Sequence, residues 1–289
     1  MTVRHRLARA GRLARYPDAS LPAIWTLMTT IRPNSALSEP SKVAAVTIGF
    51  WVIKVLATTL GETGGDWVSM SLNLGYLIGS AIFVAIFLLL VWTQVKASRF
   101  RPALFWATIV ATTTLGTTLA DFADRSLGIG YPGGVLIVAS LLAASLLLWR
   151  WSEGTVSVAN ITTPKAEWFY WITILFSQTL GTALGDWLAG TDRGGLGFGY
   201  ESGALVFGAG LAVVAALYFW TKVPHTILFW AAFILTRPLG ATLGDLLDKP
   251  LSNGGLNFSR WVASLVLLGA IFACITFIPQ RAARKGDAV

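Results

Sequence analysis

The sequence predicts an all-α polytopic membrane protein, in which four parallel two-helix repeats supply eight transmembrane helices and both termini lie in the cytoplasm. Three observations predict this fold. The 289 residues are 55% hydrophobic and only 12% charged, which is about half the charged fraction of a soluble domain. Apolar runs of about 17–21 residues recur along the chain, too long for the strands of a β-barrel. A short motif that ends in an acid recurs four times.

The apolar runs set the expected elements. Spans are expected at residues 43–64, 76–93, 103–121, 131–149, 167–185, 202–220, 225–244 and 261–278. The corresponding domains are a basic N-terminal segment at 1–41, repeats at 42–98, 99–160, 161–222 and 223–280, and a tail at 281–289.

Charge asymmetry between the loops predicts the orientation. Lys and Arg are concentrated in the N-terminal segment and in every second loop, whereas most Asp and Glu lie near the opposite ends of the spans. The positive-inside rule therefore places the basic loops and both termini in the cytoplasm. The same asymmetry accounts for the net charge of +8 without nucleic acid as a partner. The N-terminal segment itself is expected either to lie on anionic lipid as a helix or to form a basic tail.

The repeated unit has two signatures. The first is TLGETGGD at 59–66, TLGTTLAD at 114–121, TLGTALGD at 179–186 and PLGATLGD at 238–245. The second follows a Gly-rich connection and reads LNLGY at 72–76, LGIGY at 127–131, LGFGY at 196–200 and LNFSR at 256–260. Because each unit contains two spans, all units cross the membrane in the same sense and are related by an axis along its normal.

Together these motifs resemble the bacterial membrane repeat known as domain of unknown function 347, which occurs in uncharacterised membrane-anchored proteins. The resemblance covers about residues 43–280 and implies a location in the bacterial inner membrane and a repeat architecture, with little chemistry. The segment GETGGD at 61–66 also resembles, more weakly, the E-x-G-D-[KR]-[ST] motif of manganese and calcium cation/proton exchangers. It departs from that motif because Glu62 and Asp66 are four residues apart and no basic residue follows Asp66.

Small residues four apart form a smooth stripe in each unit: Gly61 and Gly65, Gly116 and Ala120, Gly181 and Gly185, Gly240 and Gly244. Such stripes let helix backbones approach closely, so one interpretation is helix packing alone. A functional interpretation adds that these four helices are the inner ones, gathered around the axis.

Directly after each stripe comes an aspartate, and these four are the main candidate metal ligands: Asp66, Asp121, Asp186 and Asp245. Ionised acids inside a membrane each cost about 2.5–3.5 kcal/mol on insertion scales, so four of them need an explanation. Either they reach water or bond to loop amides and tyrosine hydroxyls, or they converge as an oxygen-rich cation site. Glu62 lies one turn from Asp66, and such a carboxylate pair should bind a cation or hold a proton.

Several other polar residues are expected to support this site. Lys54 and Arg237 lie inside spans and are interpreted as counter-ions to the acids. Thr59 and Gln178 precede the glycines and could supply neutral oxygen ligands or bond back to the helix. Asp124 either extends the acid group of the second unit or is an exposed loop residue.

The residue types present favour transport over catalysis. One cysteine, two histidines and no Ser/His, Cys/His or HExxH arrangement give no catalytic or cofactor site, so an enzyme is not expected. Carboxylates, hydroxyls and carbonyls suit hard cations such as Mn²⁺, Mg²⁺ or Ca²⁺. The sequence thus suggests a secondary transporter or exporter of a hard metal cation, with proton exchange through the carboxylates. The alternative is a non-transporting scaffold, sensor or stress-response protein. Membrane lipid and a metal cation or proton are the expected partners, and a homo-oligomer is compatible with the sequence.

Overall fold

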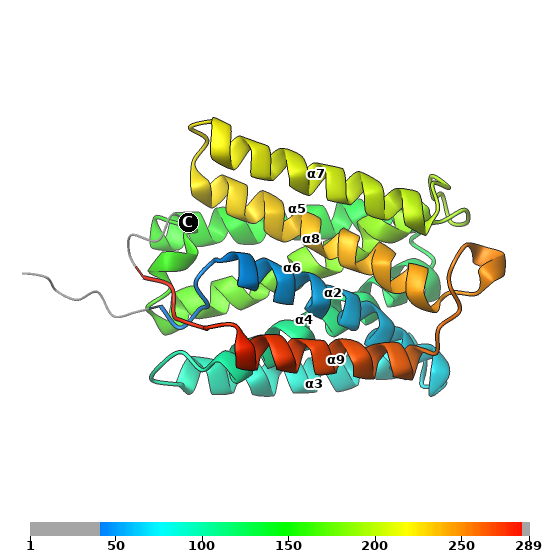
Figure 1. Cartoon of the computed structure of the whole chain (residues 1–289), viewed down its shortest axis with the longest axis horizontal. Helices are drawn as coiled ribbons and strands as arrows, with labels where there is room; N and C mark the ends of the chain where they lie inside the picture. Colours follow the sequence, from blue (N-terminus) through cyan, green and yellow to red (C-terminus); the bar gives the residue numbers. More distant parts are fainter. Residues whose placement is uncertain (1–40, 285–289) are drawn as a thin grey trace, which may run out of the picture. The chain divides into compact units, whose positions relative to one another are not determined.

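A computed structural model describes residues 41–284, so almost all of the expected basic N-terminal segment and the end of the tail lie outside the described residues. The described part is helical, with no β-strand beyond one isolated bridge between Ala44 and Ala282. Figure 1 shows its eight long helices, which are α2 (Ile48–Asp66), α3 (Gly75–Lys96), α4 (Pro102–Asp121), α5 (Tyr131–Glu153), α6 (Pro164–Ala189), α7 (Tyr200–Trp220), α8 (His225–Asp248) and α9 (Arg260–Phe277).

Each of these helices coincides with one predicted span to within a few residues. The largest difference is at the start of the first span, where α2 begins at Ile48 rather than at residue 43. The residues before it pair with residues 281–283 near the C-terminus instead, through backbone hydrogen bonds such as Ala45 N to Arg281 O at 2.9 Å and Ala283 N to Val43 O at 2.9 Å. Thr47 then ends this segment as the N-cap of α2, since its side chain accepts a hydrogen bond from a backbone amide of the first turn.

The four helices that carry the acidic motif form a closed ring. α2 packs against α4 and α8, and α6 packs against the same two helices from the opposite side. Glycine makes this close packing possible, because a Cβ at the first glycine of each motif would overlap the residue three positions before the equivalent glycine of the next unit. These pairs are Gly61 with Thr113, Gly116 with Gln178, Gly181 with Arg237, and Gly240 with Thr58. The expectation that the motif helices are inner helices is therefore confirmed.

Each outer helix packs on the inner helix of the following unit. Thus α3 packs on α4, α5 on α6 and α7 on α8, while α9 closes the circle on α2. In Figure 1 this arrangement is visible where α7 lies along α8. A single repeat therefore cannot bury its own inner helix, and the four units interlock.

Six of the eight helices are long and apolar enough to cross a membrane: α3, α4, α5, α7, α8 and α9. Leu89, Leu136, Leu205 and Val266 on the outer helices are 65–69% exposed, as expected for side chains that face lipid. The protein is accordingly a membrane protein. α2 and α6 do not reach the same apolarity, and both are inner helices that carry charged side chains within the ring.

Backbone conformation explains the second signature of the repeat. Its second residue has a left-handed φ in every unit, with values of 54° at Asn73, 70° at Gly128, 74° at Gly197 and 58° at Asn257. Asn and Gly are the residues that adopt this conformation most readily, so the alternation of Asn and Gly at this position is a turn requirement. In each repeat, the turn directs the backbone from the end of the inner helix into the outer helix.

Candidate functional site

Aromatic side chains fill the ring near the N-terminal ends of the four inner helices. A [Phe/Tyr]-Trp pair stands 11 and 10 residues before the first glycine of each motif: Phe50 and Trp51, Phe105 and Trp106, Tyr170 and Trp171, Phe229 and Trp230. We call these eight residues the aromatic layer. Ring contacts between neighbouring inner helices join Phe50 to Trp106 at 5.4 Å, Phe105 to Trp171 at 5.7 Å, and Phe229 to Trp51 at 6.0 Å.

The fourth seam of the layer, between α6 and α8, is different. Trp149 of the outer helix α5 lies there, 6.3 Å from the ring of Tyr170 and 5.9 Å from that of Trp230. The sequence-based prediction did not include this layer, although the constant spacing of the pairs from the glycine could have revealed it.

Beyond the aromatic layer, towards the motif end of the ring, lies a buried lysine. The ammonium of Lys54 donates a hydrogen bond to Gln178 Oε1 at 3.3 Å and lies 4.1 Å from the centroid of the Phe233 ring. No carboxylate of the described residues lies within 4.0 Å of it, so the expectation that Lys54 is a counter-ion to an acid is not met. An amide oxygen and an aromatic face are its partners instead.

One level further along the axis, Glu62 pairs with Arg237, as predicted. Both guanidinium NH groups donate to Glu62 Oε2 at 3.2 Å, and Arg237 NH2 also donates to the Thr117 hydroxyl at 2.6 Å. Glu62 comes from α2, Thr117 from α4 and Arg237 from α8, so three units meet at this point. All three side chains are buried.

The four motif aspartates lie next and are all buried. Two cations join them in pairs across opposite seams of the ring. Arg125 contacts Asp121 at 2.7 Å and Asp186 at 3.5 Å, at the α4–α6 seam. Lys249 contacts Asp245 at 3.0 Å and also pairs with Asp66, at the α8–α2 seam.

This pairing makes the site two-plus-two rather than fourfold. The sequence contains the signal, because units two and four read DFADR at 121–125 and DLLDK at 245–249, whereas units one and three read DWVSM at 66–70 and DWLAG at 186–190. The sequence-based prediction did not include Arg125 and Lys249 among the site residues and therefore missed their role.

The α8–α2 seam also gathers three acids. Oxygens of Glu62, Asp66 and Asp245 lie within 4.8 Å of one another, a spacing that could hold a metal ion. We call these three residues the carboxylate cluster. Burial alone would lower the pKa of Lys249, but the carboxylates of Asp245, Asp66 and Asp248 outweigh burial and hold the pKa well above its ordinary value. The ammonium is therefore charged, and Asp66 Oδ1 is left buried without a hydrogen-bond partner among the described residues.

The remaining predicted residues have other contacts. Asp124 is buried rather than exposed, and its carboxylate packs against Gly134 of α5. The Thr59 hydroxyl bonds back to the Val55 carbonyl at 3.0 Å. The Tyr131 hydroxyl donates to Asp192 at 3.1 Å, and none of the hydrogen bonds described for residues 41–284 joins a signature tyrosine to a motif aspartate.

A cavity of about 670 Å³ lies between the aspartates and the connections that follow α6 and α8, and we call it the vestibule. The charged residues that line it are Arg125, Asp186, Asp192, Lys249 and Arg260. The vestibule therefore extends to Lys249 and Asp186 at this end of the ring, whereas the buried rings of the aromatic layer fill the other end.

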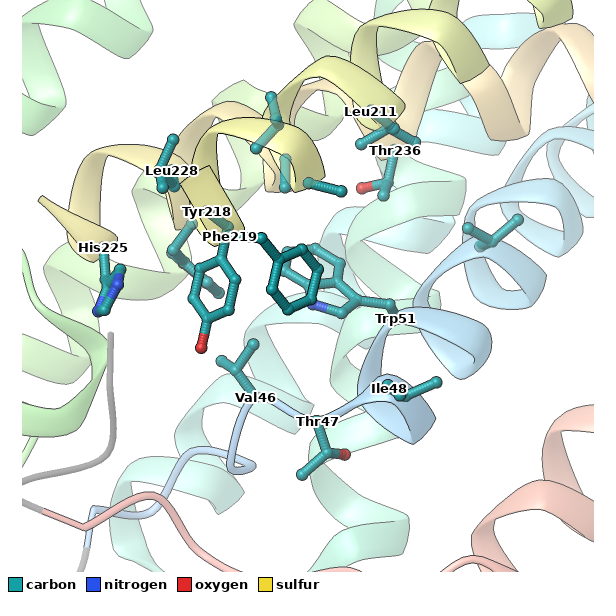
Figure 2. A pocket seen from close by; sticks show the side chains of 15 residues that line it. Val46, Thr47, Ile48, Trp51, Leu211, Tyr218, Phe219, His225, Leu228 and Thr236 are labelled. Atoms are coloured by element: carbon teal, nitrogen blue, oxygen red, sulfur yellow. The ribbon is translucent and has the colours of Figure 1, made fainter. Parts of the chain in front are cut away.

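A second cavity, of about 540 Å³, lies near the N-terminal ends of α2 and α8 and the C-terminal end of α7 (Figure 2). Figure 2 shows Trp51, Tyr218, Phe219 and His225 around it. Its lining contains no carboxylate, Lys or Arg, so it lacks ligands for a hard cation.

Comparison with known proteins gives one family. A family model described as a Repeat of Unknown Function (DUF347) matches the chain four times, at residues 49–100, 104–155, 169–223 and 228–280. Each match spans one inner and one outer helix, as the two-signature unit predicts. No curated protein and no solved structure matches the chain. The weaker likeness to manganese and calcium exchangers thus gains no support, in keeping with the different spacing of Glu62 and Asp66.

Proposed function

We propose a transport function for this chain, which belongs to the family defined by the Repeat of Unknown Function DUF347. The protein is a secondary transporter or exporter of a hard metal cation of the Mn²⁺, Mg²⁺ or Ca²⁺ type. It crosses the bacterial inner membrane eight times, with both termini in the cytoplasm. The less apolar helices α2 and α6 cross the membrane surrounded by the other helices. Protons exchange through the same carboxylates when the metal ion leaves.

The carboxylate cluster carries this proposal. Its three acids come from two repeats, are buried, and bring oxygens within 4.8 Å of one another. Like charges this close raise one another's energy, and a bound cation or a proton relieves the repulsion. Carboxylate oxygens are the preferred ligands of hard divalent ions.

The arrangement of barriers along the axis supports a transport path. Lys249 and Asp186 line the vestibule, so an ion reaches the region of the cluster from the outer end of the ring. The aromatic layer blocks the inner end with buried rings such as Phe50 and Trp106. A site open to one side and closed to the other is the arrangement that alternating access requires, with parallel repeats that move against one another.

A non-transporting scaffold would use the motifs to pack helices and anchor loops. The glycines serve packing in either case, but packing gives no reason to bury Glu62, Asp66 and Asp245 together. Because buried acids are costly in a membrane, the cluster favours the transport proposal.

Metal flux into proteoliposomes tests the proposal. Vesicles that contain the full chain and a fluorescent Mn²⁺ indicator should take up Mn²⁺, and Glu62→Gln should abolish uptake while the protein still inserts and folds. Glu201→Gln is the matched control, since Glu201 is exposed at the start of α7 and lies outside the cluster. Flux in Glu62→Gln equal to that of the unmodified protein, or no flux of Mn²⁺, Mg²⁺ or Ca²⁺ in any preparation, contradicts the proposal.

A further inference from the structure

Lys249 occupies the place in the ring where a transported cation would lie. Its ammonium contacts Asp66 and Asp245, which are two of the three acids of the carboxylate cluster. We infer that Lys249 is a tethered substitute for the transported ion: its ammonium compensates part of the negative charge of Asp66 and Asp245 when no metal is bound, and its side chain rotates into the vestibule when a divalent cation enters. This inference rests on the proposed function.

The position of Lys249 in the chain allows such a movement. α8 ends at Asp248, and Lys249 is its C-cap with an extended backbone, φ −72° and ψ 153°. Its side chain therefore belongs to the outer connection and also lines the vestibule. Rotation of the side chain into this cavity of about 670 Å³ needs no shift of α8, and water there can hydrate the ammonium.

The opposite seam holds a cation of a different kind. Arg125 lies in the π-helical turn Phe122–Ser126 that continues α4, and its guanidinium joins Asp121 to Asp186. Arginine stays charged under all ordinary conditions and its planar group binds two acids at once, so it makes a fixed link. Thr182 stands there in the place that Glu62 takes in the first unit, so this seam lacks the third acid.

The charges of the cluster indicate the class of ion. Arg237 pairs with Glu62, and Lys249 lies between Asp66 and Asp245. Arg260 lies 3.8 Å from Asp66, but its closer partner is Asp248 at 3.2 Å, so its charge is already matched outside the cluster. When Lys249 leaves, two negative charges stay uncompensated, and a divalent cation balances them where a monovalent one does not. Asp66 Oδ1, buried without a hydrogen-bond partner among the described residues, offers that ion an unused ligand atom.

Amine reactivity tests the displacement directly, with Mn²⁺ as the probe. The purified full chain in detergent is methylated with formaldehyde and a borane reductant, and the extent at each lysine is read by mass spectrometry. Mn²⁺ should increase the modification of Lys249 several-fold and leave the exposed Lys222 unchanged. If Mn²⁺ raises the thermal midpoint of the protein but Lys249 stays protected, the inference is wrong and the proposed function survives.

A variant gives a second, independent result. Lys249→Met removes the competing cation, so Mn²⁺ should bind about tenfold or more tightly, as expected when about 1.4 kcal/mol of competition is lost. Mn²⁺ flux should fall, because the ion then leaves slowly. Weaker Mn²⁺ binding in a folded Lys249→Met protein overturns the inference, and methylation of the unmodified protein decides the question if the variant does not fold. Absence of Mn²⁺, Mg²⁺ and Ca²⁺ binding to the unmodified protein overturns both the inference and the proposed function.

Discussion

Arg237 on α8 donates two hydrogen bonds to one oxygen of Glu62 on α2, each at 3.2 Å, and neither side chain reaches solvent. The two residues are 175 positions apart, in the last and the first repeat. This ion pair closes the ring of inner helices at the level of the glycine stripe. It also leaves one acid of the carboxylate cluster already neutralised.

A double-mutant cycle should show strong coupling between these two residues. Arg237→Met leaves the Glu62 carboxylate buried without its cation and should lower the free energy of unfolding by about 3–5 kcal/mol. Adding Glu62→Gln removes the orphaned charge and should restore part of that loss. Unfolding in mixed detergent micelles, followed by tryptophan fluorescence, measures both. Strictly additive effects of the two substitutions would contradict the pair.

Lys54 should behave differently from Arg237. Its ammonium is buried with only Gln178 and the Phe233 ring as partners among the described residues, so Lys54→Met removes a charge that no acid compensates. The free energy of unfolding should stay within about 1 kcal/mol of the original or rise, because an isolated buried charge is costly. The same micelle titration provides the measurement. A loss comparable to that of Arg237→Met would show that Lys54 has an ionic partner.

The glycine stripe should be intolerant of a single methyl group. In Gly116→Ala the new Cβ would lie 2.9 Å from backbone atoms of Gln178 and Thr179, and backbone cannot rotate away. We expect a loss of about 1–3 kcal/mol in unfolding free energy, the usual cost of overpacking. Gly208→Ala on α7 is the matched control, since nothing lies within 4 Å of its Cβ position. Equal stability of the two variants would argue against the ring contact.

Thiol labelling should map the two ends of the axis. Cys274 is the single cysteine, so Cys274→Ser gives a background without thiols. In that background a membrane-impermeant maleimide added from the periplasmic side should label Ala189→Cys, which lines the vestibule, but not Ile174→Cys, which is buried in the inner half of the ring. Labelling of Ile174→Cys from that side would mean that the path is open beyond the aspartates. Labelling of Ala189→Cys from the cytoplasmic side alone would reverse the proposed orientation.

The sequence was sufficient to predict the helices and the inner position of the motif. Recurrence of the acid after a small-residue stripe identified Asp66 and its three equivalents, and the intramembrane position of Arg237 indicated a partner acid. These features depend on local periodicity and on the cost of burying charge, and both can be judged from the sequence alone.

Other features depend on contacts that no local pattern reveals. Lys249 follows the end of α8, and only the closed ring brings it to Asp66. Asp124 is buried because Gly134 of α5 makes room for its carboxylate. The packing of each outer helix on the next unit likewise follows from the closed ring, which the repeat spacing alone does not define.

The most direct test of the account is equilibrium binding of radioactive Mn²⁺ to the purified full chain, compared with Asp66→Asn and Asp245→Asn. The account predicts one ion per chain, at least about tenfold weaker binding in either variant for the loss of one charged ligand, and unchanged binding in Asp192→Asn at the exposed rim. Binding that survives both Asp66→Asn and Asp245→Asn would show that acids from the first and last repeats do not form a shared cation site.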